Sequence, residues 1–455
     1  MPPKRPLRRT RAFLPYYLSR WFVALACMAW FAVERAARAG DAAEGAAFPP
    51  VEALPVCPEP PDPLIMFGSN EPVRTAEDWY QKRRPQIVAL VQHYMYGYLP
   101  EPPAVSANVR RVNPRFLDGK ATLREVTLTF GPPGTPPMDL LLIVPNGRSA
   151  PAPVFLGLNF CGNHTVVDDP QVALPRSWVP ERCRGASENR ASEEGRGSQT
   201  EVWCVDELIG RGYALATCYC GDIDPDKPDF SDGVHPHFRP AGQNEPGPHE
   251  WGTIAAWAWG LHRAVDYLVT CDDLDREKIC VVGHSRLGKT ALLAGALDER
   301  IALVVPHQSG TGGMALSRNN RQETVERINT AFPHWFNDTF TEFNGREELL
   351  PIDQHLLVCL VAPRPLLDTE GDQDLWANYD NALESLRGAD AVYKLLGRRG
   401  LVGSGVVRDD EPFDAASCGE LVQYRRDAPH VLDRKFWRRI LDFADYQLGL
   451  PSSAP

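Results

Sequence analysis

The segment 278–297 constrains the fold of this chain more than any other. A β-rich run, 278–283, ends in Gly-His-Ser285 and passes into a helix-like stretch. A serine on a tight turn between a strand and a helix has its hydroxyl pushed out of the sheet, and the backbone N–H after it can face an oxyanion. The glycine usual two residues later is Leu287, with Gly288 one place further on. A serine that only caps a helix is the alternative, but the strand before it favours a nucleophile.

Strand-like and helix-like segments alternate from about residue 120 onward. This pattern predicts an α/β fold, a mostly parallel sheet flanked by helices on both faces. Helical spacing of apolar residues predicts helices at 251–269 and 436–448. The polar stretches 165–200 and 222–250 are too long for plain connections, so we expect them to form loop insertions around an active site. The predicted strands are 123–130, 138–144, 154–160, 213–219, 278–283, 302–306, 365–370 and 392–396.

A serine nucleophile needs a base within hydrogen-bond reach and a carboxylate that orients the base. In the α/β-hydrolase fold these residues follow the chain order serine, acid, histidine. His430 precedes the last predicted helix and is the only histidine after residue 355. Between them, an apolar run leads into a turn that carries Glu370, Asp372 and Asp374. We therefore predict a triad of Ser285, His430 and one of these three acids.

The N-terminus has the features of an export signal. Six Lys and Arg residues precede a 13-residue apolar run, 21–33, which is followed by Ala-Arg-Ala. A bilayer-spanning helix needs about 20 apolar residues, so a retained membrane anchor is the weaker interpretation. We expect a signal peptide at 1–39, a linker at 40–60 and a single catalytic domain at 61–455. The mature protein would be secreted or periplasmic.

Charge and cysteine content narrow the classes of partner. Removal of residues 1–39 takes away eight Lys/Arg and one Glu, so the formal charge changes from −11 to −18. Such a balance argues against nucleic acid as a partner. Ten cysteines remain, and Cys183 with Cys204 is our candidate disulfide, whereas Cys218 and Cys220 alternate on a strand and are predicted as separate core thiols. His235 and the nearby His237 have no matching third ligand, and we interpret them as ordinary loop residues rather than a metal site.

The residues around the predicted nucleophile resemble a known family. Gly283-His-Ser-Arg-Leu-Gly-Lys289 is similar to the Gly-x-Ser-Arg-x-Gly-Lys motif of the glucuronoyl esterases, carbohydrate esterase family 15. The likeness covers most of the chain from about residue 60 to 450. It continues through Pro306-His-Gln-Ser-Gly-Thr-Gly-Gly313, Glu323-Thr-Val, Phe332-Pro-His-Trp335-Phe and Asp374-Leu-Trp376.

The resemblance implies roles for further residues. Arg286 would help to hold the tetrahedral oxyanion, Lys289 would bind sugar hydroxyls, and Glu323 with Trp376 would hold and stack on a glucuronoyl ring. Without the resemblance, we would predict that Lys289 is a surface cation, that Glu323 is a solvated carboxylate and that Trp376 is a core residue. The implied substrate is an ester of (4-O-methyl-)glucuronic acid on glucuronoxylan, as in lignin–carbohydrate links. The implied enzyme is a monomer that needs no metal or cofactor.

One position departs from the family pattern. Many members carry a glutamate as the triad acid where this chain has Gln308, and a neutral amide cannot stabilise an imidazolium as a carboxylate does. The acid must then come from elsewhere. The resemblance implies Asp374, at a position after a late strand that some bacterial members use, with Asp372 and Glu370 as alternative acids. Two alternatives stay open. The chain could be another carbohydrate esterase, specific for acetyl or feruloyl groups, or a glucuronate-binding homologue with weakened catalysis.

Overall fold

The computed structural model describes residues 48–239, 242–243 and 246–450. The predicted signal peptide, 1–39, and the first part of the predicted linker lie outside these residues. The second part belongs to the folded body, because Val51 and Leu54 are buried and the Cys57 N–H donates to the Glu348 carbonyl at 2.7 Å. In the ranges described, no helix is both long enough and apolar enough to cross a bilayer.

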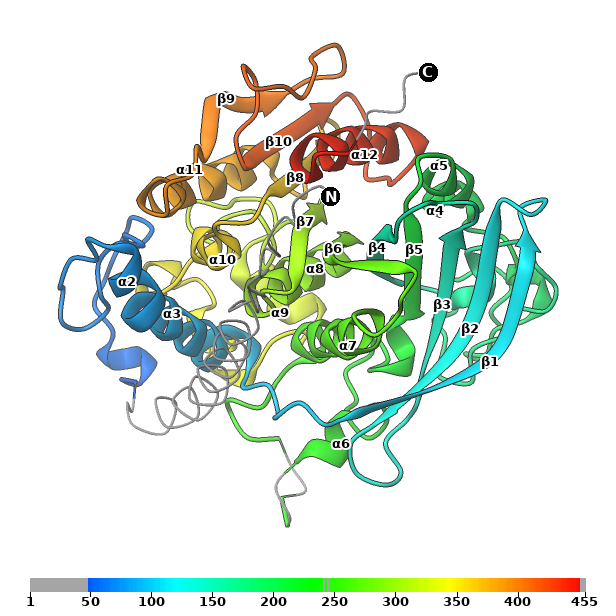
Figure 1. Ribbon diagram of the computed structural model, residues 1–455. Coiled ribbons are helices and arrows are strands. Elements are labelled where there is room, and N and C mark those ends of the chain that lie inside the picture. The colour runs from blue at the N-terminus through cyan, green and yellow to red at the C-terminus, as the bar shows by residue number, and fades with distance from the viewer. Residues whose placement is uncertain (1–47, 240–241, 244–245, 451–455) are drawn as a thin grey trace, which may run out of the picture. The chain divides into compact units, whose positions relative to one another are not determined.

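A ten-stranded sheet forms the centre of the fold, with strand order β1-β2-β3-β5-β4-β6-β7-β8-β10-β9 (Figure 1). The seven strands from β5 to β9 in this order are parallel, and β3, β2 and β1 extend the sheet antiparallel. The strands are β1 Val105–Phe116, β2 Ala121–Phe130, β3 Met138–Pro145, β4 Ala152–Asn159, β5 Ala214–Tyr219, β6 Leu274–His284, β7 Ile301–His307, β8 Leu366–Gly371, β9 Leu401–Val407 and β10 Leu421–Arg426.

Helices cover the sheet and fill the connections. The α-helices are α2 Ala76–Asp78, α3 Arg84–Val91, α4 Thr200–Trp203, α5 Val205–Gly210, α6 His235–Phe238, α7 Thr253–Leu268, α8 Arg286–Leu297, α9 Val325–Ala331, α10 Gln354–Val361, α11 Tyr379–Leu395 and α12 Arg434–Leu448. Two π-helical turns, η2 Trp79–Arg83 and η3 Gln92–Tyr96, continue α2 and α3. The 3-10 turns are η1 Val51–Ala53, η4 Asn163–Thr165, η5 Glu193–Gly195, η6 Cys220–Asp222, η7 Asp338–Phe343 and η8 Glu347–Leu349.

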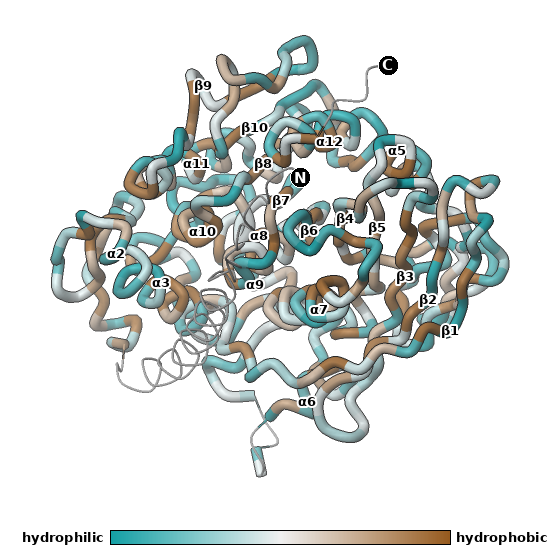
Figure 2. The backbone as a smooth tube through the Cα atoms, viewed as in Figure 1, coloured by the Kyte–Doolittle hydropathy of each residue, from teal (hydrophilic) through white to brown (hydrophobic). Residues whose placement is uncertain are grey.

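The two faces of the sheet are covered by different helices. On one face α7, α8, α10 and α11 pack on one another and on the strands, and on the other face α12 packs with α4 and α5. The rings of Phe155 on β4 and Trp437 on α12 meet edge to face, with centroids 5.5 Å apart. Because both faces are covered, the central strands are near-continuous apolar runs, and Figure 2 shows hydrophobic stretches along them.

The structure confirms the predicted α/β fold and corrects parts of the strand assignment. The first seven predicted ranges overlap β2 to β8, but the prediction of a strand at 392–396 is wrong, because Val392 and Tyr393 are buried residues of the last turns of α11. That short apolar run continues the helical spacing set by Leu386 and Ala389. The strands β1, β9 and β10 were not predicted, and exposed or charged residues break the alternation in β1.

Candidate active site

Ser285 lies on the turn between β6 and α8 in a backbone conformation that few L-residues adopt. Its φ of 60° and ψ of −128° fall in a region that costs about 1–3 kcal/mol unless the surroundings hold it. The Ser285 N–H donates to the His307 carbonyl on β7 at 2.9 Å, and the Ser285 carbonyl accepts from the Gly288 N–H at 2.8 Å. Ser285 is also the N-cap of α8, so the free N–H groups and the positive end of the helix dipole begin beside it.

Two glycines allow the strand and the helix to approach closely at this turn. A Cβ on Gly283 would lie 1.9 Å from the Leu287 carbonyl oxygen, and a Cβ on Gly288 would lie 2.8 Å from the His307 carbonyl oxygen. Neither distance is tolerable for real atoms. Leu287 is itself buried in the core. The glycine that stands one place later than usual therefore occupies the position that faces β7.

His430 and Asp374, far apart in the sequence, meet beside this turn. Asp374 follows β8 and is buried, whereas His430 precedes α12 and is partly open to solvent. The His430 Nδ1 and the Asp374 Oδ2 are 2.5 Å apart, and the His430 ring centroid lies 4.4 Å from that of His284, the residue before Ser285. An ionised carboxylate only accepts hydrogen bonds, so Nδ1 carries the proton and Nε2 is the basic nitrogen.

The two alternative acids have other partners. Asp372 accepts from Arg408 at 2.5 Å and from Arg425 at 3.2 Å. Glu370 is fully buried on β8, and neither of its carboxylate oxygens has a hydrogen-bond partner among the residues described. Burial and the nearby Asp368 raise the pKa of Glu370 well above its usual range. Among the three predicted acids, the hydrogen bond to His430 is made by Asp374.

Gln308, the residue that departs from the family pattern, forms hydrogen bonds with the backbone of the residues on both sides of His430. Its Nε2 donates to the Pro429 carbonyl at 2.9 Å, and its Oε1 accepts from the Val431 N–H at 2.9 Å. A glutamate at this position could accept from Val431, but when ionised it could not donate to Pro429. The amide thus suits a residue that fixes the backbone on either side of the histidine.

Replacing Gln308 with alanine should loosen this segment. Two partly buried backbone groups would lose their partners and a cavity would form, so we expect the free energy of unfolding to fall by about 2–4 kcal/mol and kcat to fall by roughly tenfold. Thermal unfolding and steady-state kinetics of the variant measure the two effects. Gln308→Glu is the matched control and should fall between alanine and wild type in both. An unchanged kcat in a destabilised alanine variant would show that Gln308 only supports the fold.

Arg286, the first residue of α8, turns its guanidinium toward a buried carboxylate. Its Nη1 donates to the Asp226 Oδ2. Its guanidinium carbon lies 4.8 Å from the ring centroid of Trp335 and 5.1 Å from that of Phe332, and these two rings are stacked at 3.7 Å. The side chain predicted to support the oxyanion is therefore held at fixed contacts beside Ser285.

Lys289 and Glu323 form a buried pair below the turn. Lys289 is only 3% exposed, and its ammonium donates to the Ser309 carbonyl at 2.7 Å, the Thr311 carbonyl at 2.6 Å and the Glu323 Oε2 at 3.1 Å. Burial lowers the pKa of Lys289, against the opposing charge of Glu323. An ammonium has three N–H donors, so all of them are engaged within the protein. A sugar hydroxyl could reach Lys289 only by replacing one of these partners.

Trp376 is placed differently from a core residue. It lies two residues after Asp374 with 49% of its surface exposed, and the adjacent Leu375 is 59% exposed. Large apolar side chains that protrude next to a catalytic group are suited to contact a ligand. The stacking role that the resemblance implies for Trp376 is compatible with this exposure of its ring.

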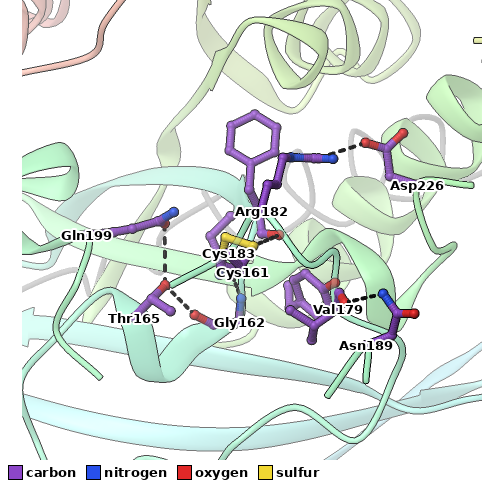
Figure 3. The surroundings of a disulfide bond; sticks show 12 residues. Cys161, Gly162, Thr165, Val179, Arg182, Cys183, Asn189, Gln199 and Asp226 are labelled. Atoms are coloured by element: carbon purple, nitrogen blue, oxygen red, sulfur yellow. Dashed lines mark hydrogen bonds and ion pairs between the residues drawn. A yellow bond between two sulfur atoms is a disulfide. The ribbon is translucent and has the colours of Figure 1, made fainter. Parts of the chain in front are cut away.

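The disulfide differs from the predicted one. Cys183 is bonded to Cys161, not to Cys204, which is a buried free thiol (Figure 3). The prediction was wrong because it sought a bridge within one polar loop, whereas the structure joins that loop to the segment that follows β4. Cys218 and Cys220 are buried and free, which confirms their prediction as core thiols.

His235, in the loop 222–250, has structural partners. His235 is buried, its Nδ1 lies 2.9 Å from the Asp224 Oδ1, and its Nε2 lies 2.9 Å from the Trp251 carbonyl oxygen. Within residues 48–239, 242–243 and 246–450, no three His, Cys, Asp or Glu side chains are grouped to hold a metal ion.

Sequence reasoning missed several residues that contact Arg286 directly or through Asp226. Asp226 and Arg182 come from the two long loops, and no motif distinguishes them from other charged loop residues. His334 and Trp335 stand in a stretch that supported the family resemblance, but they were given no role. Their contacts with one another depend on loops that meet only in the folded chain.

Comparisons with known proteins agree on one family. Residues 246–397 match the family described as "Glucuronyl esterase, fungi". A curated carbohydrate esterase named MZ0003, from an unknown prokaryotic organism, is 42% identical over 390 residues, which is 85% of this chain and 89% of that protein. A 4-O-methyl-glucuronoyl methylesterase from Phanerochaete carnosa is 29% identical over 74% of this chain and 72% of its own length.

Solved structures give the same result. A promiscuous CE15 esterase from the marine bacterial metagenome superposes with a TM-score of 0.78 at 41% identity, and the match covers 87% of this chain and 98% of that one. A glucuronoyl esterase from Solibacter usitatus gives a TM-score of 0.78 at 36% identity over 87% of this chain and 99% of that one. With the sheet and the turn at Ser285, these matches show that the chain belongs to the glucuronoyl esterases, carbohydrate esterase family 15, and is a carboxylic ester hydrolase of the α/β-hydrolase fold.

Proposed function

We propose that this chain hydrolyses esters of (4-O-methyl-)glucuronic acid through a triad of Ser285, His430 and Asp374. The natural substrate would be an ester link between the glucuronic acid of glucuronoxylan and a lignin-type alcohol. The observation that carries the proposal is the 2.5 Å contact between His430 and Asp374 beside the strained turn at Ser285. Relatives named 4-O-methyl-glucuronoyl methylesterases support the choice of acyl group.

In the acylation step, the Ser285 hydroxyl attacks the ester carbonyl while the Nε2 of His430 takes its proton. Asp374 keeps His430 in the tautomer that makes Nε2 basic, and it stabilises the imidazolium that forms. The oxyanion would be held by the Arg286 side chain and by N–H groups at the start of α8. His430 then gives the proton to the departing alcohol, which leaves the glucuronoyl group on Ser285.

In the deacylation step, His430 takes a proton from water, and the water oxygen attacks the glucuronoyl ester. The tetrahedral intermediate collapses, Ser285 recovers its proton from His430, and free uronic acid leaves. No external electron donor or acceptor is needed, because the reaction is a net addition of water. The expected export of the mature chain would bring this chemistry to the plant cell wall.

A less selective carbohydrate esterase is a second candidate. The three donors of Lys289 are engaged within the protein, so its predicted contact with the sugar is not preformed. A solved relative at 41% identity is described as a promiscuous esterase. Exposed Trp376 could then contact acetylated or feruloylated substrates as well.

A substrate panel tests the proposal. The purified mature chain should release benzyl alcohol from benzyl glucuronate with a kcat/KM at least about tenfold above that for acetylated xylan or a feruloyl ester, since one well-placed pocket contact discriminates by about that factor. Chromatography of the alcohol and acid products measures the rates, and the Ser285→Ala protein corrects for contaminating esterases. Equal or faster cleavage of the other esters would favour the second candidate. Glucuronate binding without hydrolysis of any ester would indicate a binding homologue.

A further inference from the structure

Asp226 is a buried carboxylate that collects four donors from three other segments of the chain. Its side chain is 4% exposed. The Oδ2 accepts from the Arg286 Nη1 and from the Arg182 Nη2 at 3.1 Å. The Oδ1 accepts from the His334 Nε2 at 3.0 Å and from the Trp335 Nε1 at 3.0 Å. So many donors around one carboxylate are typical of a group that must stay ionised while buried.

The charge of Asp226 persists at any pH at which the enzyme would act. Burial by itself would raise the pKa of Asp226, but the hydrogen bond from His334 and the charge of Arg286 outweigh it and hold the pKa well below its usual range. A permanently charged acceptor can hold an arginine in one orientation. Asp226 is therefore suited to a constant positional role rather than to proton transfer.

Arg286 needs such a partner because its side chain is long and mobile. Several rotatable bonds separate the guanidinium from the start of α8. Without a partner, the side chain would adopt several rotamers that place its N–H donors differently. Asp226 fixes one end of the guanidinium, and Trp335 contacts both groups, since its N–H donates to Asp226 while its ring centroid lies 4.8 Å from the Arg286 guanidinium carbon. Donors that are already in place cost no reorganisation when the oxyanion develops.

The carboxylate is also tied, through Arg182, to the other long loop, 165–200. Figure 3 shows the contact between Arg182 and Asp226. Arg182 directly precedes Cys183, which is bonded to Cys161 in the segment after β4. The Arg182 side chain is half exposed, so its own packing holds it weakly. The neighbouring disulfide holds the backbone at Arg182 in place. The two long loops are thus joined at Asp226.

We propose that Asp226 is a positioning residue for Arg286, and that it preorganises this arginine for the oxyanion without touching the substrate. The inference rests on the proposed function, in which Arg286 stabilises the oxyanion. The oxyanion exists only in the transition state and the intermediates around it, so loss of the positioning should lower kcat and leave KM nearly unchanged. We expect Asp226→Asn to lower kcat by about 10- to 100-fold, which is less than the cost of removing an oxyanion donor outright.

A double-mutant cycle tests the inference. The kcat and KM values of Asp226→Asn, Arg286→Met and the double variant are compared with wild type on benzyl glucuronate and on p-nitrophenyl acetate. If Asp226 acts through Arg286, the second change should cost little once Arg286 is gone, and the double variant should match Arg286→Met within about twofold. Additive losses, or a wild-type kcat in Asp226→Asn, would overturn the inference.

Controls separate this role from simple stabilisation. Asp169→Asn removes another buried carboxylate of the long loops, one that accepts from Arg111 at 2.6 Å, and should lower the unfolding temperature without lowering kcat. If the chain cleaves only p-nitrophenyl acetate, the glucuronoyl proposal fails, yet the cycle on that ester still decides the role of Asp226, since every ester forms an oxyanion. A folded chain that cleaves no ester would overturn both.

Discussion

Replacing Ser285 with alanine should lower kcat by about 10⁴- to 10⁶-fold, the cost expected when a triad nucleophile is removed. The loss follows from chemistry alone, because no other group at the turn offers a lone pair at that position. The fold should remain, since the turn is held by backbone hydrogen bonds to His307 and Gly288 that alanine also makes. Initial rates on benzyl glucuronate and thermal unfolding measure the two effects, and glucuronate should still bind.

Ser285→Gly is the matched control for this variant. Glycine adopts a φ of 60° without the side-chain strain of serine or alanine, so the glycine protein should unfold at a temperature no lower than that of the alanine protein. Both variants should be equally inactive because both lack the hydroxyl. Substantial hydrolysis by either variant, with contaminating esterases excluded, would show that Ser285 is not the nucleophile.

Replacing Asp374 with asparagine should lower kcat by about 10³- to 10⁴-fold. Asparagine is nearly the same size as aspartate. In the wild type, the Asp374 Oδ1 accepts a hydrogen bond from the Ala377 N–H at 3.3 Å, and the oxygen of asparagine can still accept this bond. What disappears is the negative charge beside His430, and with it the preference for the tautomer that leaves Nε2 basic. The loss should therefore appear in kcat at every pH, with little change in KM or in unfolding temperature.

Asp372→Asn is the control for this second experiment. Asp372 lies two residues away but pairs with Arg408 and Arg425, so its loss should affect stability more than catalysis. A large loss of kcat in Asp372→Asn together with normal activity in Asp374→Asn would reassign the acid. Comparable losses in both would mean that the loop geometry, rather than one carboxylate, supports His430.

The sheet could be predicted from the sequence wherever local patterns are strong. Strands β3, β4, β5 and β7 are short, mainly apolar runs, and α7 and α12 have clear helical spacing. The local pattern failed at 392–396, where the end of α11 is as apolar as a strand. It also failed for β9, because Gly403 and Gly405 lie within this strand and weaken its pattern, so its pairing with β10 supports the strand conformation.

The site could be predicted only in part, because many of its contacts join residues that are far apart in the sequence. Ser285 is marked by its own neighbours in sequence, and the order of residues along the chain selected His430 and an acid in the turn 370–374, while the family resemblance favoured Asp374. The disulfide of Cys161 with Cys183 could not be predicted, because pairing depends on which loops meet in space. For Lys289, the resemblance supplied a role, but the sequence could not indicate that its ammonium is engaged on all sides.

The sequence by itself determined the turn at Ser285, because a strand, a strained serine and a helix are encoded within one continuous segment whose glycines allow the strand and the helix to approach closely. It also determined which residues were available as base and acid. Only the tertiary structure decided that Asp374 rather than Asp372 meets His430, that Gln308 holds the segment of the histidine, and that Asp226 gathers Arg286, Arg182 and His334. Local conformation depends on neighbouring residues, whereas these contacts join side chains that only the folded sheet and its loops bring together.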